Sequence, residues 1–249
     1  AFAGRRTTKV VDGESLTAWS TEECTWDELS PPRCRERLPK LRPRSASFND
    51  TQTVLRLRDV LDLVSDAAYE QGREIGVVLE IKHATYFDSL GWDFAGLIAA
   101  ELREAGWADG ALPLFVEAFE STVLAQLRAR GIRGTYVYLL EASGTPFDRL
   151  TRFGAKAPTY AHATTARGLD ELVGVVDGIS VDKRMILAPD ARGRARGGVT
   201  FINDAHARGL RVFTWTCRLE NAVLTPQVRT KIGKAAMGDY EAEWALIRY

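Results

Sequence analysis

The pattern of hydrophobic positions changes near residue 50. The first fifty residues carry a cluster of arginines and are interrupted by Pro31, Pro32, Pro39 and Pro43. We therefore expect residues 1–50 to form an irregular, insertion-like segment with only short strands such as Lys9–Val11. Beyond it, apolar residues recur at the spacing of an amphipathic helix, and Asn49, Asp50 and Thr51 offer a cap at its start. The sequence predicts a helix from this cap to Gln71, before Gly72.

A regular alternation of two patterns follows this helix. Five short runs are nearly continuous in apolar or β-branched residues and predict buried parallel strands covered on both faces: Val77–Ile81, Leu114–Ala118, Tyr136–Leu140, Gly178–Val181 and Arg211–Trp215. Between them lie segments with helical spacing: Phe94–Ala105, Ser121–Arg130, Leu169–Val176 and Phe201–Arg208. Strands and helices that alternate in this way indicate parallel βαβ units with right-handed crossovers.

Two α/β architectures fit this alternation, a doubly wound sheet and a β/α barrel. A nucleotide-binding doubly wound sheet would carry a phosphate-binding fingerprint, but neither GxGxxG nor GxxxxGK[ST] is present. Polar residues at the ends of the predicted strands favour the barrel, whose chemistry gathers in the loops after its strands. We predict a single domain over residues 1–249, a TIM-type barrel that is incomplete, with about five recognisable parallel strands.

The sharpest chemical pattern is at the end of the first predicted strand. Glu80 lies within the predicted strand Val77–Ile81, and Lys82 directly follows this strand. The two residues are two positions apart, so they share one face of the sheet. At a barrel mouth, a glutamate can bind a hard divalent cation, and a lysine can place a positive charge on a phosphate. A simple ion pair at a strand end accounts for the same two residues, so both interpretations stay open.

A second carboxylate repeats this theme in the next strand. Glu117 interrupts the apolar run Leu114–Ala118, where an unpaired buried carboxylate would be costly, so we expect it at the mouth near Glu80. Asp182-Lys183 and Trp215, at the ends of later strands, extend these residues into a possible ring. Trp215 could equally be an aromatic residue of the core.

The histidines and cysteines form no recognisable motif. HExxH, GxSxG and CxxC are absent. His83 follows Glu80 and Lys82 with opposite strand parity, His162 has no acidic partner close in sequence, and we expect His206 to face solvent. Cys24, Cys34 and Cys217 allow either unpaired thiols or a local Cys24–Cys34 disulfide, so they do not fix the compartment.

The composition narrows the possible partners. Lys plus Arg and Asp plus Glu number 33 each, so the formal net charge is zero and we expect no nucleic-acid partner. No run approaches the roughly 18 apolar residues that a membrane helix needs. The first residues also lack the apolar core of a signal peptide.

The stretch Leu79–Phe87 resembles the Glu-Ile-Lys strand of the glycerophosphodiester phosphodiesterases. Further segments agree with that family in order along the chain: Arg5–Lys9 with Asp12-Gly13, Glu36–Pro39, Ser47–Asn49, Phe115–Phe119, and Trp215-Thr216 with Glu220-Asn221. The resemblance implies a distorted TIM barrel that hydrolyses glycerophosphodiesters to glycerol 3-phosphate and an alcohol. It also implies a divalent cation, Ca²⁺ or Mg²⁺, held by carboxylates, and two histidines that perform the acid–base or nucleophilic chemistry.

The resemblance assigns roles to four residues. Glu80 matches a metal-binding carboxylate, and Lys82 matches a catalytic lysine that faces the phosphate. Trp215 matches an aromatic residue lining the mouth, and Glu117, a weaker match, is expected to bind substrate there. Members of the longer type are often exported, so the resemblance weakly favours a periplasmic or extracellular location for this protein.

Several family segments have no counterpart in this sequence. The His-Arg-Gly, Glu-x-Asp and His-Glu segments are absent, and Tyr240–Tyr249 resembles the final helix without the last strand. We therefore expect a metal-dependent enzyme that is inactive as this chain alone. A degenerate barrel that serves as a phosphate-binding or interaction module is the alternative, and another metal-assisted barrel hydrolase or lyase is a third. An open sheet has free edges, so either residues 1–50 cover the gap or the chain self-associates.

Overall fold

The computed structural model describes residues 2–192, 194–197 and 199–248. Its centre is a parallel sheet of five strands in the order β3 (Val77–Ile81), β4 (Leu114–Ala118), β5 (Thr135–Leu140), β6 (Gly178–Asp182) and β9 (Arg211–Trp215). All five predicted strands are present and pair in register with their neighbours. Across the described ranges the sheet does not close, and β3 and β9 form its edges. The predicted open α/β sheet of five strands is confirmed.

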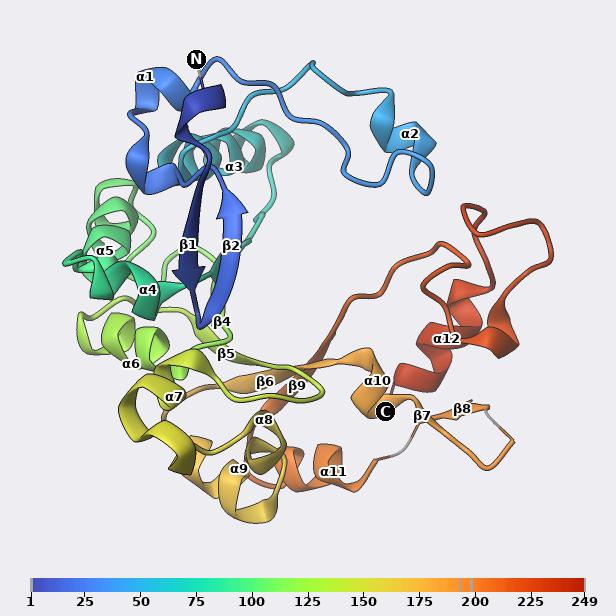
Figure 1. The fold of residues 1–249 in the computed structure, drawn as a ribbon. Helices are drawn as coiled ribbons and strands as arrows, with labels where there is room; N and C mark the ends of the chain where they lie inside the picture. Colours follow the sequence, from blue (N-terminus) through green and yellow to red (C-terminus); the bar gives the residue numbers. More distant parts are fainter. Residues whose placement is uncertain (1, 193, 198, 249) are drawn as a thin grey trace.

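Helices follow the outer side of the curved sheet (Figure 1). Those that the sequence predicted are α3 (Leu57–Gln71), α5 (Phe94–Glu104), α6 (Ser121–Ala129), α9 (Ala166–Leu172) and α11 (Thr200–His206). Helices that the sequence did not predict occupy the connections: α4 (Ala84–Ser89), α7 (Phe147–Phe153), α8 (Tyr160–Ala163) and α10 (Lys183–Ile186). Two of these, α4 and α10, follow their strands almost at once and so shape the end of the sheet at which the strands finish.

The hydrophobic core lies between the sheet and its helices. Leu61, Val116, Leu124, Leu140 and Leu169 are fully buried in this layer. The opposite face of the sheet is covered unevenly. Val137 and Leu139 are buried there, whereas Val78 is 63% exposed. The expectation that every strand is covered on both faces is therefore wrong for β3, because it is an edge strand whose inner face lines a cavity.

A β-hairpin occupies part of the segment that was expected to be irregular. Strand β1 (Thr7–Val11) pairs antiparallel with β2 (Glu14–Ala18) around the two-residue turn Asp12-Gly13. Both turn residues have positive φ, 51° and 82°, which is the geometry that an Asp-Gly turn favours. The hairpin extends well beyond the expected short strand at Lys9–Val11. Two short helices, α1 (Trp26–Leu29) and α2 (Pro43–Ala46), follow it.

Helix α3 begins at Leu57, beyond the cap that the sequence indicated at Asn49–Thr51. The hydroxyl of Thr51 donates to the carbonyl of Phe48 at 2.7 Å, so it closes a turn and does not cap the helix. The helix starts instead after Arg56, whose backbone N–H donates to the Asp59 carboxylate at 2.9 Å. The predicted cap at Asn49–Thr51 was wrong because this local turn uses its polar groups.

The C-terminal part returns toward the N-terminal segment. Helix α12 (Tyr240–Ile247) confirms the predicted final helix, except that Tyr249 lies outside the described residues. A small antiparallel pair, β7 (Ala188–Pro189) and β8 (Ala195–Arg196), precedes it. Both α2 and α12 lie on the open side of the molecule (Figure 1). There Arg42 Nε donates to Glu220 Oε1 at 2.7 Å across 178 residues of sequence.

Two further expectations concern the cysteines and the membrane. Cys24, Cys34 and Cys217 are free thiols, so the local disulfide that the sequence allowed is not formed. In the described part of the chain, no helix combines the length and apolar character needed to cross a bilayer.

Candidate active site

The inner face of the sheet lines an open cavity of about 780 Å³. Glu80 and Glu117 are direct register partners on β3 and β4, and strand parity places Lys82 on the same face. The cavity is lined by these three residues and by Glu141, Trp215 and Arg218, among others. The structure thus brings together the four residues to which the resemblance assigns roles, Glu80, Lys82, Glu117 and Trp215, while these roles remain predictions.

Electrostatic contacts link the three charged residues of the first two strands. Lys82 Nζ lies 3.1 Å from Glu80 Oε1, so the simple ion pair considered above is present. It does not close the site, because 62% of the Lys82 side chain and 32% of the Glu80 side chain remain exposed to the cavity. Burial raises the pKa of Glu117 above its ordinary value, the charge of Glu80 raises it further, and Lys82 offsets part of the effect. A positive charge between the two carboxylates would relieve this repulsion.

Trp215 forms the aromatic wall of the cavity. Its indole Nε1 donates to the carbonyl of Ser180 at 3.3 Å, and its ring meets Phe119 edge-on with centroids 5.5 Å apart. The ring is therefore held in place while it remains partly exposed. Both earlier interpretations of Trp215 apply in part, because it packs like a core residue and still faces the cavity.

The carboxylates that line the cavity could supply only part of the coordination shell of a divalent cation. Among the residues that the structure describes, no group of three or more His, Cys, Asp or Glu side chains is placed to hold a metal ion. Glu80, the predicted metal-binding carboxylate, and Glu117 beside it carry oxygen atoms of the kind that Ca²⁺ and Mg²⁺ prefer, but Ca²⁺ takes roughly six to eight oxygens. Further ligands would have to come from water, substrate or other protein groups.

Asp182 and Lys183 do not extend the ring of charges, contrary to the prediction. Asp182 accepts hydrogen bonds from Arg184 Nε at 3.0 and 2.9 Å. Lys183 is buried, and its Nζ donates to Glu243 Oε1 at 2.6 Å and to the carbonyl of Val223 at 2.7 Å. The contacts of Asp182 stabilise the start of α10, and those of Lys183 attach α12. Both charges are paired within the protein, so neither is available to a ligand.

Sequence reasoning missed a pair beside the site. His83 Nδ1 lies 2.6 Å from Asp12 Oδ2, at the tip of the β1–β2 hairpin. Both residues have positive φ, an uncommon conformation outside glycine. The Asp-Gly turn signal could have located the tip, but no local pattern connects it to His83.

Three more titratable residues, Glu141, His162 and His206, differ in their position relative to the cavity. Glu141 directly follows β5 and faces the cavity, a strand-end position like that of Glu117 that the sequence could have flagged. His162 Nε2 lies 3.0 Å from Glu171, outside this cavity, so its acidic partner is nine residues away. His206 is exposed, as predicted.

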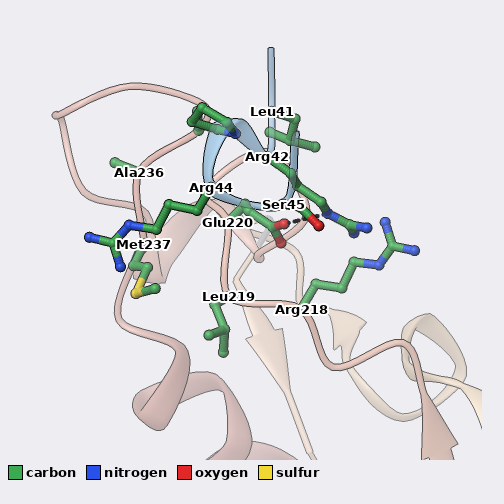
Figure 2. Close-up of a pocket in the computed structure, with 11 residues that line it drawn as sticks. Leu41, Arg42, Arg44, Ser45, Arg218, Leu219, Glu220, Ala236 and Met237 are labelled. Carbon is green, nitrogen blue, oxygen red and sulfur yellow. Dashed lines mark hydrogen bonds and ion pairs between the residues drawn. The ribbon is translucent and has the colours of Figure 1, made fainter. Parts of the chain in front are cut away.

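A second cavity of about 480 Å³ adjoins the first at Arg218, which lines both. Its walls come from residues 41–45 and from two segments after β9, residues 218–220 and 235–237. Figure 2 shows Glu220 in the middle of this cavity, joined to Arg42, with Arg44 and Arg218 on either side.

Comparisons with known proteins bear on the family. No family model matches the chain. A plant protein, glycerophosphodiester phosphodiesterase GDPD6 of Arabidopsis thaliana, is 25% identical over 240 residues, which cover 90% of this chain and 59% of the relative. The predicted resemblance to the glycerophosphodiester phosphodiesterases is confirmed.

A solved structure supports the fold. A protein of Silicibacter pomeroyi DSS-3, assigned as a glycerophosphoryl diester phosphodiesterase, superposes with a TM-score of 0.53 at 15% identity. The match covers 85% of this chain and 65% of that protein. The chain thus spans somewhat less than two thirds of the length of either relative. At this identity the structural likeness concerns the fold alone.

Proposed function

We propose that this chain supplies one side of the active site of a phosphodiesterase that hydrolyses glycerophosphodiesters to glycerol 3-phosphate and an alcohol. One observation carries the proposal. Glu80, Lys82 and Glu117 end neighbouring parallel strands and face a common cavity, in a chain that resembles the glycerophosphodiester phosphodiesterases. This is the end of the sheet at which β/α barrels place their chemistry.

The charges suit a phosphodiester that must gain negative charge as it reacts. Water adds to phosphorus, the bond from phosphorus to the alcohol oxygen breaks, and the alcohol leaves with a proton. Lys82 offsets charge on the phosphoryl oxygens, and its side chain, although paired with Glu80, is exposed enough for its ammonium group to approach them. Glu80 would hold a Ca²⁺ or Mg²⁺ ion, which supplies further positive charge at the phosphate, and Glu117 beside it would contact the substrate. Trp215 would bound the space that the substrate enters.

Proton transfer in the described cavity would fall to carboxyl groups such as Glu117 and Glu141. No histidine lies among the residues lining the cavity in the part of the chain the structure covers. The family resemblance assigns acid–base work to two histidines in segments that this sequence lacks. Because positioned acid–base groups contribute roughly 10²–10⁴-fold each, we propose that this chain alone turns over slowly.

Cation binding provides the direct test of this proposal. Calcium and magnesium would be titrated into the chain by calorimetry, alone and with glycerophosphocholine, for the parent and for Glu80→Gln. We expect the cation to strengthen glycerophosphocholine binding, and Glu80→Gln to remove that enhancement. Glu74→Gln, an exposed glutamate after α3, is the matched control. Identical titrations for Glu80→Gln and the parent would argue against the site.

The second candidate function is a phosphate-binding module without turnover. The feature that favours it is the lack of a three-carboxylate cluster among the described side chains. Release of glycerol 3-phosphate from glycerophosphocholine by the 249-residue chain separates the two functions. Slow turnover that Lys82→Ala removes supports the enzyme, whereas binding of glycerophosphocholine without turnover supports the module.

A further inference from the structure

We infer that the cavity between α2 and the segments after β9 binds the alcohol portion of the diester and selects an alcohol that carries negative charge. This rests on the proposed function, which places the phosphate in the neighbouring cavity. The volume of about 480 Å³ is in the range of small-molecule sites, roughly 300–1,000 Å³.

The walls of this cavity are held together by a specific contact. Arg42 from the N-terminal segment donates to Glu220 from the C-terminal segment at 2.7 Å, and both side chains are mostly shielded, with 26% and 16% exposed. The pair therefore fixes the distance between two parts of the chain that are otherwise remote in sequence (Figure 2). A cavity with a fixed width is suited to distinguish ligands by their size and charge.

The lining has a net positive charge. It contains three guanidinium groups, Arg42, Arg44 and Arg218, and one carboxylate, Glu220. Glu220 is engaged by Arg42, whereas neither Arg44 nor Arg218 has a carboxylate within ion-pair distance among the described residues. Two guanidinium groups thus have no direct carboxylate partner, although Arg218 is near enough to Glu36 and Glu220 to help lower the pKa of both carboxyl groups. The planar fork of arginine matches the geometry of carboxylate and phosphate groups.

Arg218 connects the two cavities. It lines this cavity and also the one that contains Glu80 and Lys82. A diester whose phosphate lies over Lys82 would therefore extend its alcohol portion past Arg218 and into the space bounded by Leu41, Leu219 and Met237. These apolar side chains suit a carbon skeleton, while the arginines suit an anionic group attached to it.

The same lining argues against a cationic alcohol. Sites that recognise quaternary ammonium groups surround them with aromatic rings. The residues that line this cavity in the described structure include no aromatic side chain, and their charge is positive. Choline and ethanolamine would therefore be disfavoured relative to an alcohol that bears a phosphate or a carboxylate.

Direct binding of two diesters tests the inference without the need for turnover. The probes are bis(glycerophospho)glycerol, whose alcohol portion carries a phosphate, and glycerophosphocholine, whose alcohol portion is cationic. Both would be titrated by calorimetry into the 249-residue chain in calcium. We expect the first to bind about tenfold more tightly, the scale of one charge-assisted hydrogen bond.

Variants separate this cavity from general electrostatic attraction. Arg44→Ala removes one guanidinium group from this cavity and none from the sheet cavity, so we expect it to weaken the anionic diester and remove most of the preference, while glycerophosphocholine binds no more weakly than to the parent. Arg73→Ala, an exposed arginine after α3 that lines neither cavity, should keep the preference and is the matched control. Lys82→Ala should weaken both probes about equally, because both share the glycerophosphodiester group.

The outcomes distinguish a failure of the anionic subsite from a failure of the proposed function. Equal binding of both probes, or an equal loss in Arg44→Ala and Arg73→Ala, overturns the anionic subsite and leaves the proposed function standing. Failure of both probes to bind the parent chain overturns the proposed function and this inference with it. A preference that is lost only in Arg44→Ala supports both.

Discussion

His83 Nδ1 lies 2.6 Å from the carboxylate of Asp12, so the tip of the β1–β2 hairpin is joined to the residue that directly follows Lys82. The other Asp12 oxygen, Oδ1, is buried without a hydrogen-bond partner among the described atoms. The nearby carboxyl group of Glu120 accepts from the Thr85 N–H at 3.1 Å, and its pKa is raised by burial and further by Asp12 and Asp148. The hairpin is thus attached at a crowded, acidic end of the sheet.

Removing this attachment should loosen the hairpin more than it destabilises the chain. The His83 side chain is 45% exposed, and a hydrogen bond contributes roughly 0.5–1.5 kcal/mol net, so we expect His83→Asn to lower the unfolding free energy by about 1 kcal/mol. Asparagine tolerates the positive φ of this position, so the variant removes the contact without straining the backbone. Hydrogen exchange of the β1 and β2 amides should accelerate in this variant. Glu14→Gln, an exposed position on β2, is the control. Unchanged exchange in His83→Asn would show that other contacts hold the hairpin.

Breaking the buried ion pair between Lys183 and Glu243 should strongly lower the free energy of unfolding. Glu243 is fully buried, and it also accepts from the Thr225 N–H at 2.6 Å. Removing one partner leaves an uncompensated buried charge, so we expect Lys183→Met to lower the unfolding free energy by about 3–5 kcal/mol in urea titrations. The double variant Lys183→Met/Glu243→Leu should recover part of this loss. A double variant no more stable than the single one would contradict this account.

Glu117 gives a pH dependence of defined sign. Because its folded-state pKa is raised by burial and by Glu80, the native chain binds this proton more tightly than the unfolded chain does. Stability associated with Glu117 is therefore present below the ordinary glutamate pKa and is lost as the pH rises through the raised folded-state value. Glu117→Gln removes this loss, so we expect its Tm at pH 7 to exceed that of the parent by roughly 1–3 °C.

The same comparison at low pH provides the check. Below the ordinary glutamate pKa both states of the parent are protonated, and the difference between Glu117→Gln and the parent should vanish. Glu74→Gln, at an exposed position, should show no pH-dependent difference at either end. A Tm advantage of Glu117→Gln that persists unchanged at low pH would mean that the amide improves packing and that charge is not the cause.

The sequence predicted the parts of this structure that local patterns determine. The five strands follow from short apolar runs, and the convergence of Glu80 and Glu117 follows from strand parity and parallel pairing. The structure adds contacts between distant residues. Arg42 and Glu220 are 178 positions apart, and Lys183 and Glu243 are 60 apart. No periodicity indicates such pairs, so Lys183 was placed in the site and the second cavity was missed.

The open sheet leads to a last prediction, about self-association. Neither β3 nor β9 pairs with another strand on its outer side in the described residues, and unpaired strand edges favour pairing between chains. Residues 41–45 reach the segments after β9, yet Val78 on the edge strand β3 remains 63% exposed. We therefore expect the chain to associate at micromolar concentrations and Val78→Lys to shift it toward the monomer, as measured by light scattering. Leu97→Lys, which changes a 47% exposed residue on α5, should leave association unchanged. A monodisperse parent monomer over this range would show that the edges are protected.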